Sequence, residues 1–308
     1  MSVILEHVTI RYGDLKAVND VSATFPPGST GLLGPNGAGK SSLIKGLLGL
    51  VSFSSGRASI LGRDVGLERK AIRQMIGYMP EEDCLIPGLT GIGMVQYTGE
   101  LSGMSRDDAM QRAHGLLFIV GLEEARYRKV ETYSAGMKQR IKLAQALVHD
   151  PKLLFLDEPT SGMDPKGRQE MLDLIEDISS RGRMSIVLAS HILVDVERTC
   201  QRVVIMNRGK VLKEGSVEDL RGSYVGTYTV RIEGDQEKFV KALEKVKCTV
   251  HPNGNYLWDV TLPKGKQTDL ILKAARDTHV QIRKLVISVE TLEDVFVKLI
   301  GEEQHADL

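Results

Sequence analysis

The sequence is poor in cysteine and carries no excess of charge of either sign. Its three cysteines, Cys84, Cys200 and Cys248, lie far apart and without CxxC spacing, which argues against a disulfide framework and against a zinc cluster. A reducing cytoplasm fits this cysteine usage best. Forty Lys and Arg residues balance forty Asp and Glu residues, so the formal net charge is zero. We therefore expect no basic surface for nucleic acid at the level of the whole chain.

Long apolar runs are also missing. No stretch approaches the roughly 18 uninterrupted apolar residues of a membrane-spanning helix. Residues 1–10 contain no Lys or Arg and include Glu6, so the charged-then-apolar layout of a signal peptide is not seen. The 308 residues, 42% of them apolar and 26% charged, match an ordinary globular protein with one large domain and a small one. If the protein acts at a membrane, we expect a partner that spans it.

Apolar periodicity divides the first part of the chain into a β-rich start and an α/β core. Residues 3–25 alternate like short strands and predict a small antiparallel β lobe. Strand-like residues 30–33 run into a glycine-rich loop and then into a helix with one apolar face over residues 43–48. Short apolar runs at 153–156 and 185–189 are typical of buried parallel strands.

The remaining segments complete the predicted fold. Residues from about 91 to 148 are rich in Leu, Ala, Met, Arg and Glu and predict a helical insertion. After a linker at residues 222–226, the pattern predicts a βαββαβ order. Its predicted strands are 228–232, 248–251, 256–261 and 280–289, and its predicted helices are 236–246, 267–278 and a final 292–300. The predicted fold class is α/β: a large α/β core domain over residues 1–222, then a small α+β ferredoxin-like domain over residues 223–308.

A phosphate-binding loop is predicted where the first core strand meets its helix. Residues 34–41 satisfy GxxxxGK[ST] in the required strand-to-helix context. Gly37 and Gly39 allow backbone N–H groups to turn toward phosphate oxygens, and the helix start adds a partial positive charge. Lys40 supplies a cation for the outer phosphates, and the Ser41 hydroxyl can ligate Mg²⁺. The alternative is a glycine-rich turn that contains a lysine by chance.

Two carboxylates follow the apolar run at 153–156. Asp157 stands where a P-loop hydrolase needs a Mg²⁺ ligand, and Glu158 stands where it needs a base for the attacking water. The alternative is a pair that merely caps a strand beside Pro159. The presence of Lys40 upstream favours the catalytic interpretation. Together the two motifs predict that the core over residues 1–222 has the P-loop NTPase (RecA-like) fold.

The order of further motifs resembles the ATP-binding-cassette (ABC) family over roughly residues 3–220. Residues 133–140, about twenty before Asp157, are similar to the signature segment of that family. Residues 161–164 resemble its D-loop, and His191 resembles its switch histidine. Tyr12 resembles the aromatic residue that stacks on adenine, with Val18 at the expected short distance.

The resemblance implies a site for ATP and Mg²⁺ with residues in three roles. The residues implied in nucleotide binding are Tyr12, Val18, Gly34, Pro35, Asn36, Gly37, Ala38, Gly39, Lys40, Ser41 and Ser42, joined in trans by the signature residues Ser134, Ala135, Gly136 and Met137. The implied metal-site residues are Ser41, Asp157 and Glu81. The implied catalytic residues are Glu158, His191 and Lys40.

Several of these positions keep a second interpretation. Taken alone, Tyr12 is a packing residue on a strand, His191 a satisfied polar residue, and Ser134 the N-cap of a helix. Ala135 stands where the family usually has glycine, and its methyl group leads us to expect a negative φ there. Glu81 replaces the usual glutamine, so it either reaches the metal or the water, or faces basic residues of a partner.

The resemblance implies an ATPase subunit of a membrane transporter. The signature of one chain and the phosphate loop of another would share each ATP, so a dimer, most simply a homodimer, is expected. An integral membrane subunit is the second expected partner, docked near residues 83–101, which would place the chain at the cytoplasmic face of the membrane. Nucleic acid is not expected as a partner.

The direction of transport is predicted from the end of the chain. Residues 288–296 look like part of the domain appended to bacterial export ATPases for drugs, ions and polysaccharides. An importer ATPase is the alternative within transport, although its appended domain would more often be all-β. A soluble cassette ATPase of DNA repair or translation is a further alternative. Such proteins usually carry a coiled coil, a zinc element or a second cassette, and this sequence shows none of them. A non-hydrolysing regulatory cassette conflicts with the presence of Lys40, Asp157, Glu158 and His191.

Overall fold

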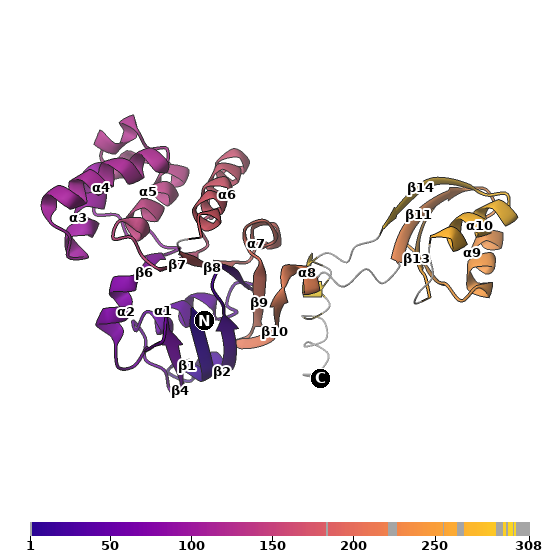
Figure 1. Ribbon diagram of the computed structural model, residues 1–308, viewed down its shortest axis with the longest axis horizontal. Helices are drawn as coiled ribbons and strands as arrows, with labels where there is room; N and C mark the ends of the chain where they lie inside the picture. Colours follow the sequence, from indigo (N-terminus) through magenta and orange to yellow (C-terminus); the bar gives the residue numbers. More distant parts are fainter. Residues whose placement is uncertain are drawn as a thin grey trace. The chain divides into compact units, whose positions relative to one another are not determined.

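The computed structural model describes residues 2–182, 184–220, 227–254, 256–263 and 268–287, together with 292, 293, 295–297 and 299. The chain divides into two compact units, Met1–Val217 and Glu218–Leu308, which we describe separately (Figure 1). The predicted domain boundary between 222 and 223 and the predicted linker 222–226 fall on residues 221–226, outside the described part of the chain.

The first unit is built around a six-stranded sheet. Its strands are β3 (Ser29–Leu33), β6 (Ile76–Met79), β7 (Leu153–Asp157), β8 (Ser185–Ser190), β9 (Arg202–Asn207) and β10 (Lys210–Ser216). They lie in the order β10-β9-β3-β8-β7-β6, and all neighbours are parallel except β10 and β9. Strands β3 and β7 are buried along their whole length, as expected for parallel strands covered on both faces.

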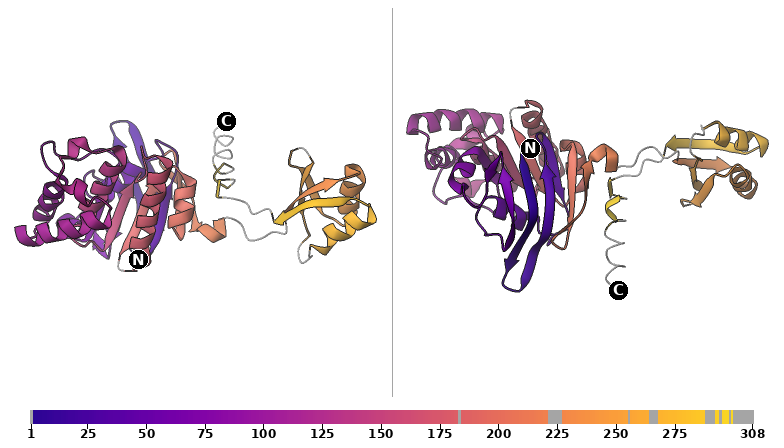
Figure 2. Two further views of the ribbon diagram at one scale, coloured as in Figure 1. Left: turned by 90° about the horizontal axis from the view of Figure 1, so that it is seen from above. Right: turned by 60° about the horizontal axis from the view of Figure 1, so that its bottom comes forward.

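A second, antiparallel sheet forms the predicted β lobe. Its strands, in the order β2-β1-β4-β5, are β2 (Leu15–Phe25), β1 (Val3–Tyr12), β4 (Ser55–Ile60) and β5 (Arg63–Asp64). Helix α1 (Lys40–Leu47) lies beside this lobe in Figure 1, and the right view of Figure 2 shows the two long indigo strands of the lobe, β1 and β2, side by side. Its apolar face, with Leu43 and Ile44, shares one core with β1, β2 and the facing side chains of the six-stranded sheet, among them Phe155 and Val187. Burial of this face holds α1 in the core, so that the helix begins close to the carboxyl end of β3, from which the chain reaches it through residues 34–39.

The predicted helical insertion is present as a lobe at the β6 side of the large sheet (Figure 1). Its helices are α3 (Gly91–Leu101), α4 (Arg106–Ile119) and α5 (Ala135–Leu147), with short 3₁₀ turns at Glu124–Tyr127 and Val130–Thr132. The N-caps Thr90, Ser105 and Ser134 each accept a hydrogen bond from a backbone N–H of the first helical turn, which satisfies donors that the helix leaves free. The other helices of the unit are α2 (Arg69–Met75), α6 (Pro165–Ser180) and α7 (Leu193–Thr199), and the short α8 (Val217–Leu220) spans the boundary between the two units.

The second unit has the predicted βαββαβ order. Its elements are β11 (Thr227–Glu233), α9 (Gln236–Lys245), β12 (Thr249–Pro252), β13 (Leu257–Thr261), α10 (Asp269–Asp277) and β14 (Gln281–Ile287). The strands form an antiparallel sheet in the order β12-β13-β11-β14, which is the ferredoxin-like arrangement. Val230, Phe239 and Ile271 are buried in its separate core. Of the predicted helix 292–300, residues 292, 293, 295–297 and 299 are helical, and the rest lie outside the described residues.

Cys84, Cys200 and Cys248 are all free thiols, the first exposed and the other two buried. Among the described residues, no helix combines the length and the apolar character needed to cross a bilayer.

Candidate nucleotide site

The predicted phosphate loop lies between β3 and α1, and glycines shape its last turn. Gly37 and Gly39 have φ values of +81° and +100°, a region that favours glycine because it has no Cβ. A Cβ on Gly39 would also collide with the carbonyl oxygen of Ala17. No side chain caps α1, so the N–H groups of its first turn remain available to an anion.

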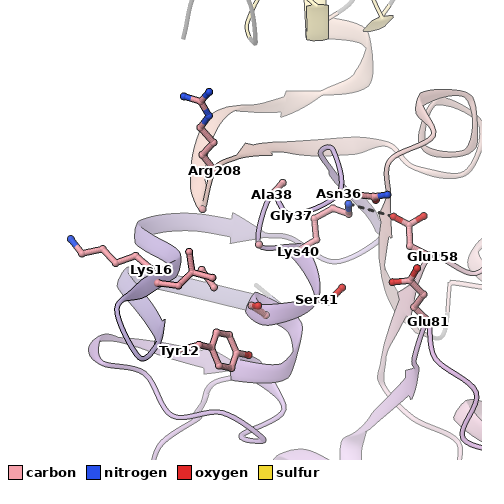
Figure 3. A pocket seen from close by; sticks show the side chains of 15 residues that line it. Tyr12, Lys16, Asn36, Gly37, Ala38, Lys40, Ser41, Glu81, Glu158 and Arg208 are labelled. Atoms are coloured by element: carbon pink, nitrogen blue, oxygen red, sulfur yellow. Dashed lines mark ion pairs between the residues drawn. The ribbon is translucent and has the colours of Figure 1, made fainter. Parts of the chain in front are cut away.

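Lys40 opens α1 and is almost completely buried. Its Nζ donates hydrogen bonds to the carbonyl oxygens of Gly34 and Pro35, at 2.7 and 3.3 Å. The same Nζ lies 3.4 Å from Glu158 Oε1. The loop therefore holds its cation beside a carboxylate that follows β7, two strands away from β3 in the sheet, as the dashed line in Figure 3 marks.

Ser41 and Asp157 bring two oxygen ligands together. The Ser41 hydroxyl donates a hydrogen bond to Asp157 Oδ1 at 3.1 Å. Asp157 ends β7 and is 1% exposed, and burial raises the pKa of its carboxyl group, while the hydrogen bond from Ser41 opposes that rise. Negative charge on Glu81 and Glu158 raises this pKa further. A hydroxyl beside a desolvated carboxylate is a donor set that suits Mg²⁺.

Glu158 follows β7 in a left-handed backbone conformation, with φ at +48°. For a residue other than glycine such a conformation costs about 1–3 kcal/mol and is often found at functional sites. Its side chain is buried, with Oε2 2.9 Å from His191 Nδ1. Oε1 has no hydrogen-bond partner and faces the cation of Lys40 across 3.4 Å. The backbone turn thus places one free carboxylate oxygen at the phosphate loop.

These groups border one open cavity of about 630 Å³ (Figure 3). The cavity is lined by Tyr12, Leu15, Lys16, Ala17, Asn36, Gly37, Ala38, Gly39, Lys40, Ser41, Ser42, Glu81, Glu158, Arg208 and Gly209. Ten of these were predicted from the sequence, from Tyr12 on β1 to Glu158 beyond β7. Tyr12 is 44% exposed, so it is available for stacking rather than committed to the core.

Other predicted nucleotide-site residues do not line the cavity. Gly34 and Pro35 contribute carbonyl oxygens to Lys40 instead. Val18 is completely buried in the core that β2 shares with α1. Neighbouring residues of a strand point to opposite faces, so it is Ala17, one position earlier, that reaches the cavity wall.

The cavity also includes residues that the sequence analysis missed. Leu15, Lys16 and Ala17 belong to the start of β2. Arg208 and Gly209 form the turn between β9 and β10, and Gly209 N–H donates to the Ala38 carbonyl oxygen at 3.0 Å. The sequence offered two weak indications of these cavity residues: a lysine between Tyr12 and Val18, and an arginine-glycine pair typical of a turn.

The signature residues are not part of this cavity. Ser134 accepts a hydrogen bond from the Met137 N–H at 3.3 Å and caps α5. Both Ser134 and Ala135 are exposed. Ala135 is helical and is not among the residues with positive φ, so the expectation of a negative φ at this position is confirmed. The helix start packs near the predicted D-loop, because Gln139 Nε2 donates to the Ser161 carbonyl oxygen at 2.9 Å.

Comparison with known proteins agrees with this geometry. Residues 18–161 match the family model of the ABC transporter, and residues 215–300 match the C-terminal domain of DrrA1-3-like ATP-binding proteins. The linearmycin resistance ATP-binding protein LnrL of Bacillus subtilis is 33% identical over 303 residues, which cover 96% of this chain and 97% of LnrL. The chain belongs to the ABC transporter ATP-binding proteins.

This ABC protein is also similar to an export ATP-binding protein and to a solved ATP-binding subunit. The Nod factor export ATP-binding protein I of Rhizobium sp. is 33% identical over 308 residues and 99% of both chains. A solved structure of an ATP-binding subunit of an ABC transporter superposes with a TM-score of 0.65 at 28% identity, over 72% of this chain and 92% of that one. The P-loop NTPase fold and the ATPase class predicted for the chain are therefore confirmed.

Proposed function

We propose that this ABC ATPase binds Mg²⁺-ATP in the cavity of Figure 3 and powers export through a membrane-spanning partner. The observation that carries the proposal is the meeting of Lys40, Ser41 and Glu158 at one cavity whose floor is a free helix start. A cation, a hydroxyl and a buried carboxylate in that arrangement suit the transfer of a phosphoryl group to water. Tyr12 at the far wall offers a ring face to a purine base.

The phosphates would lie against the backbone N–H groups of the phosphate loop and the start of α1. Lys40 neutralises charge on the outer phosphates, since a charged donor binds phosphate more strongly than a neutral one. In the structure its Nζ already rests between the loop carbonyls and Glu158. ATP binding therefore exchanges these contacts for phosphate oxygens.

Ser41 and Asp157 are the residues that would hold Mg²⁺, with Glu81 as a third oxygen ligand from the cavity wall. The fit rests on the 3.1 Å contact of Ser41 with Asp157 and on the burial of that carboxylate, because a desolvated carboxylate gains from a nearby cation. When bound, the metal neutralises charge on the phosphates. We assign Glu81 to the metal side on its place in the lining.

Glu158 would accept the proton of the attacking water. Its Oε1 lacks a hydrogen-bond partner, while Oε2 is held by His191. A carboxylate that is oriented on one oxygen and free on the other is the arrangement expected of a general base. We assign His191 to the orientation of Glu158 and to contact with the terminal phosphate.

A second copy of the chain would complete each site. Ser134 and Ala135 are exposed at the capped start of α5 and do not line their own chain's cavity. A helix start is a site for anions, so we assign Ser134, Ala135, Gly136 and Met137 to the ATP held by the partner's phosphate loop. Closure of the dimer on ATP and its opening after hydrolysis would drive the membrane subunit.

Export is supported by the relatives and by the C-terminal match. LnrL is named for linearmycin resistance, and the Rhizobium protein is named for Nod factor export. Both are matched over nearly the whole chain, the DrrA-like region 215–300 included. We therefore favour an exporter over an importer, with the ATPase on the cytoplasmic side, and assign the C-terminal unit to regulation or coupling.

The experiment that tests the proposal is ATP binding and hydrolysis by the purified chain and by Lys40→Ala. The variant should lose affinity for ATP and turn it over more slowly, because it removes a cation from a site filled with phosphate charge. EDTA should abolish wild-type turnover. ATP affinity measured by calorimetry that does not change in Lys40→Ala would contradict the assignment of the site.

A further inference from the structure

Lys142 is a buried cation that the proposed steps of binding and hydrolysis do not use. It lies on α5, two turns beyond the exposed Ser134, and only 1% of it is exposed. It is among the largest side chains that are fully buried in the described part of the protein. Burial of an ammonium group costs free energy unless its hydrogen bonds are made. The partners of Lys142 therefore account for its burial.

Its partners are the backbone carbonyl oxygens of successive residues just beyond β6. Lys142 Nζ donates to Pro80 O at 2.9 Å and to Glu81 O at 2.8 Å, and it lies 3.5 Å from Glu82 O. An ammonium group has three hydrogens, which matches three acceptors. The segment has left the sheet and has no regular structure, so these bonds replace ladder bonds that it cannot make.

Glu81 belongs to this segment and also to the nucleotide cavity. Its carbonyl oxygen is held by Lys142, while its side chain lines the cavity opposite Lys40. Figure 3 shows the Glu81 carboxylate beside that of Glu158, on the loop that leaves the strand below. The direction of the Glu81 side chain therefore depends on a backbone that is fixed from α5.

We propose that Lys142 is a positioning residue that clamps the backbone of residues 80–82 and so aims the Glu81 carboxylate into the ATP site. The proposal rests on the metal-side role assigned to Glu81 above. Because Lys142 and Ser134 are on the same helix, the clamp also ties Glu81 to the signature end of α5. A shift of α5 would move Glu81 on the metal side of the cavity, because Lys142 joins α5 to the main chain of residues 80–82 by hydrogen bonds.

Nearby negative charges partly offset the cost of burying the Lys142 ammonium. Burial lowers the pKa of the Lys142 ammonium, and the negative charges of Asp83, Glu81 and Asp157 act in the opposite direction. One turn earlier, Lys138 forms an ion pair with Asp83 at 2.7 Å. That pair is largely exposed and contributes little, so Lys138 is the natural control for Lys142.

The test compares Lys142→Met with Lys138→Met, which remove the same cation from a buried and from a half-buried position of one helix face. A nitroxide label on the exposed Cys84, next to the clamped segment, reports its mobility, since Cys200 and Cys248 are buried. ATP affinity without metal and the Mg²⁺ concentration for half-maximal hydrolysis are measured on the same proteins. Glu81→Ala and the double variant Glu81→Ala/Lys142→Met complete the set.

We expect Lys142→Met to give a mobile nitroxide spectrum and to raise the half-maximal Mg²⁺ concentration about 10-fold, as loss of a group that orients a metal ligand typically does. ATP affinity without metal should stay within about threefold, because the phosphate loop is intact. Lys138→Met should resemble the wild type. The double variant should be no worse than Glu81→Ala, because both changes act through one side chain.

An immobile label in Lys142→Met, or additive effects in the double variant, would overturn the clamp. A mobile label with unchanged Mg²⁺ dependence would show that Lys142 holds the segment without positioning Glu81, which also overturns the proposal. If Glu81→Ala itself leaves the Mg²⁺ dependence unchanged, the role assigned to Glu81 fails, independently of the label. Should Lys142→Met not fold, Lys142→Gln keeps a donor and should shift both readouts less, in the same direction.

Discussion

His191 Nδ1 lies 2.9 Å from Glu158 Oε2. An ionised carboxylate has no proton to give, so the ring nitrogen is the donor and the contact fixes which nitrogen carries hydrogen. The two residues follow β8 and β7, neighbouring parallel strands whose carboxyl ends meet at the same edge of the sheet. His191 therefore restrains one oxygen of Glu158, while the other, Oε1, faces the Lys40 ammonium across 3.4 Å.

Replacement of the ring tests this relationship. His191→Ala should lower ATP turnover by about 10- to 100-fold, because the base loses the group that orients it. ATP affinity should remain within about threefold, since the phosphate loop and Lys40 are left intact. Phosphate release and calorimetry on the same preparations measure the two quantities. Wild-type turnover in His191→Ala would show that the contact with Glu158 has no part in hydrolysis.

The exposed N-cap of α5 predicts complementation between two chains. Ser134→Arg should bind ATP normally as a monomer but should not hydrolyse it, because we place Ser134 at the partner's ATP. Lys40→Ala should be inactive for the opposite reason. A mixed dimer of the two variants holds one intact site, so mixing should restore part of the activity.

Each variant alone, at the same total concentration, is the control for that mixture. The measurements are ATP-dependent dimerisation by size-exclusion chromatography and phosphate release over a series of mixing ratios. Activity should peak near equal amounts of the two chains. No recovery at any ratio would argue against sites shared head to tail.

Removal of residues 224–308 tests the proposal that the first unit binds and hydrolyses ATP while the C-terminal unit serves regulation or coupling. The shortened chain should fold, bind ATP and hydrolyse it, because every cavity residue precedes residue 210 and the C-terminal unit has its own core. Circular dichroism and ATP calorimetry check the two parts of this expectation. A shortened chain that aggregates, or that is folded but does not bind ATP, would mean that the C-terminal unit completes the ATPase.

The site residues that could be predicted are those on continuous motifs. The phosphate loop joins a strand to a helix within a few residues, so its spacing alone predicts where Lys40 and Ser41 lie. Asp157 and Glu158 end an apolar strand, and parallel strands bring such ends to one edge. The ferredoxin-like unit was also predictable, because its strands and helices alternate with clear apolar faces.

The parts that could not be predicted depend on tertiary register or burial. Strand β1 pairs with β2 through several register shifts, so sequence alternation could not tell that Ala17, rather than Val18, faces the cavity. Gly209 reaches the phosphate loop only because β9 pairs with β3. Lys142 is one of many lysines on helices, most of which are solvated, and only the packing of α5 against residues 80–82 reveals its burial.

Glu158→Gln tests the central claim, that this chain hydrolyses ATP with Glu158 as the base, most directly. Phosphate release and ATP affinity should be measured together on the wild type and on the variant, which keeps the shape and hydrogen-bonding capacity of the side chain but cannot take a proton. Turnover should fall by about 10²- to 10⁴-fold, the usual contribution of a positioned general base, while ATP binding and the ATP-stabilised dimer persist. Hydrolysis near the wild-type rate would contradict the account.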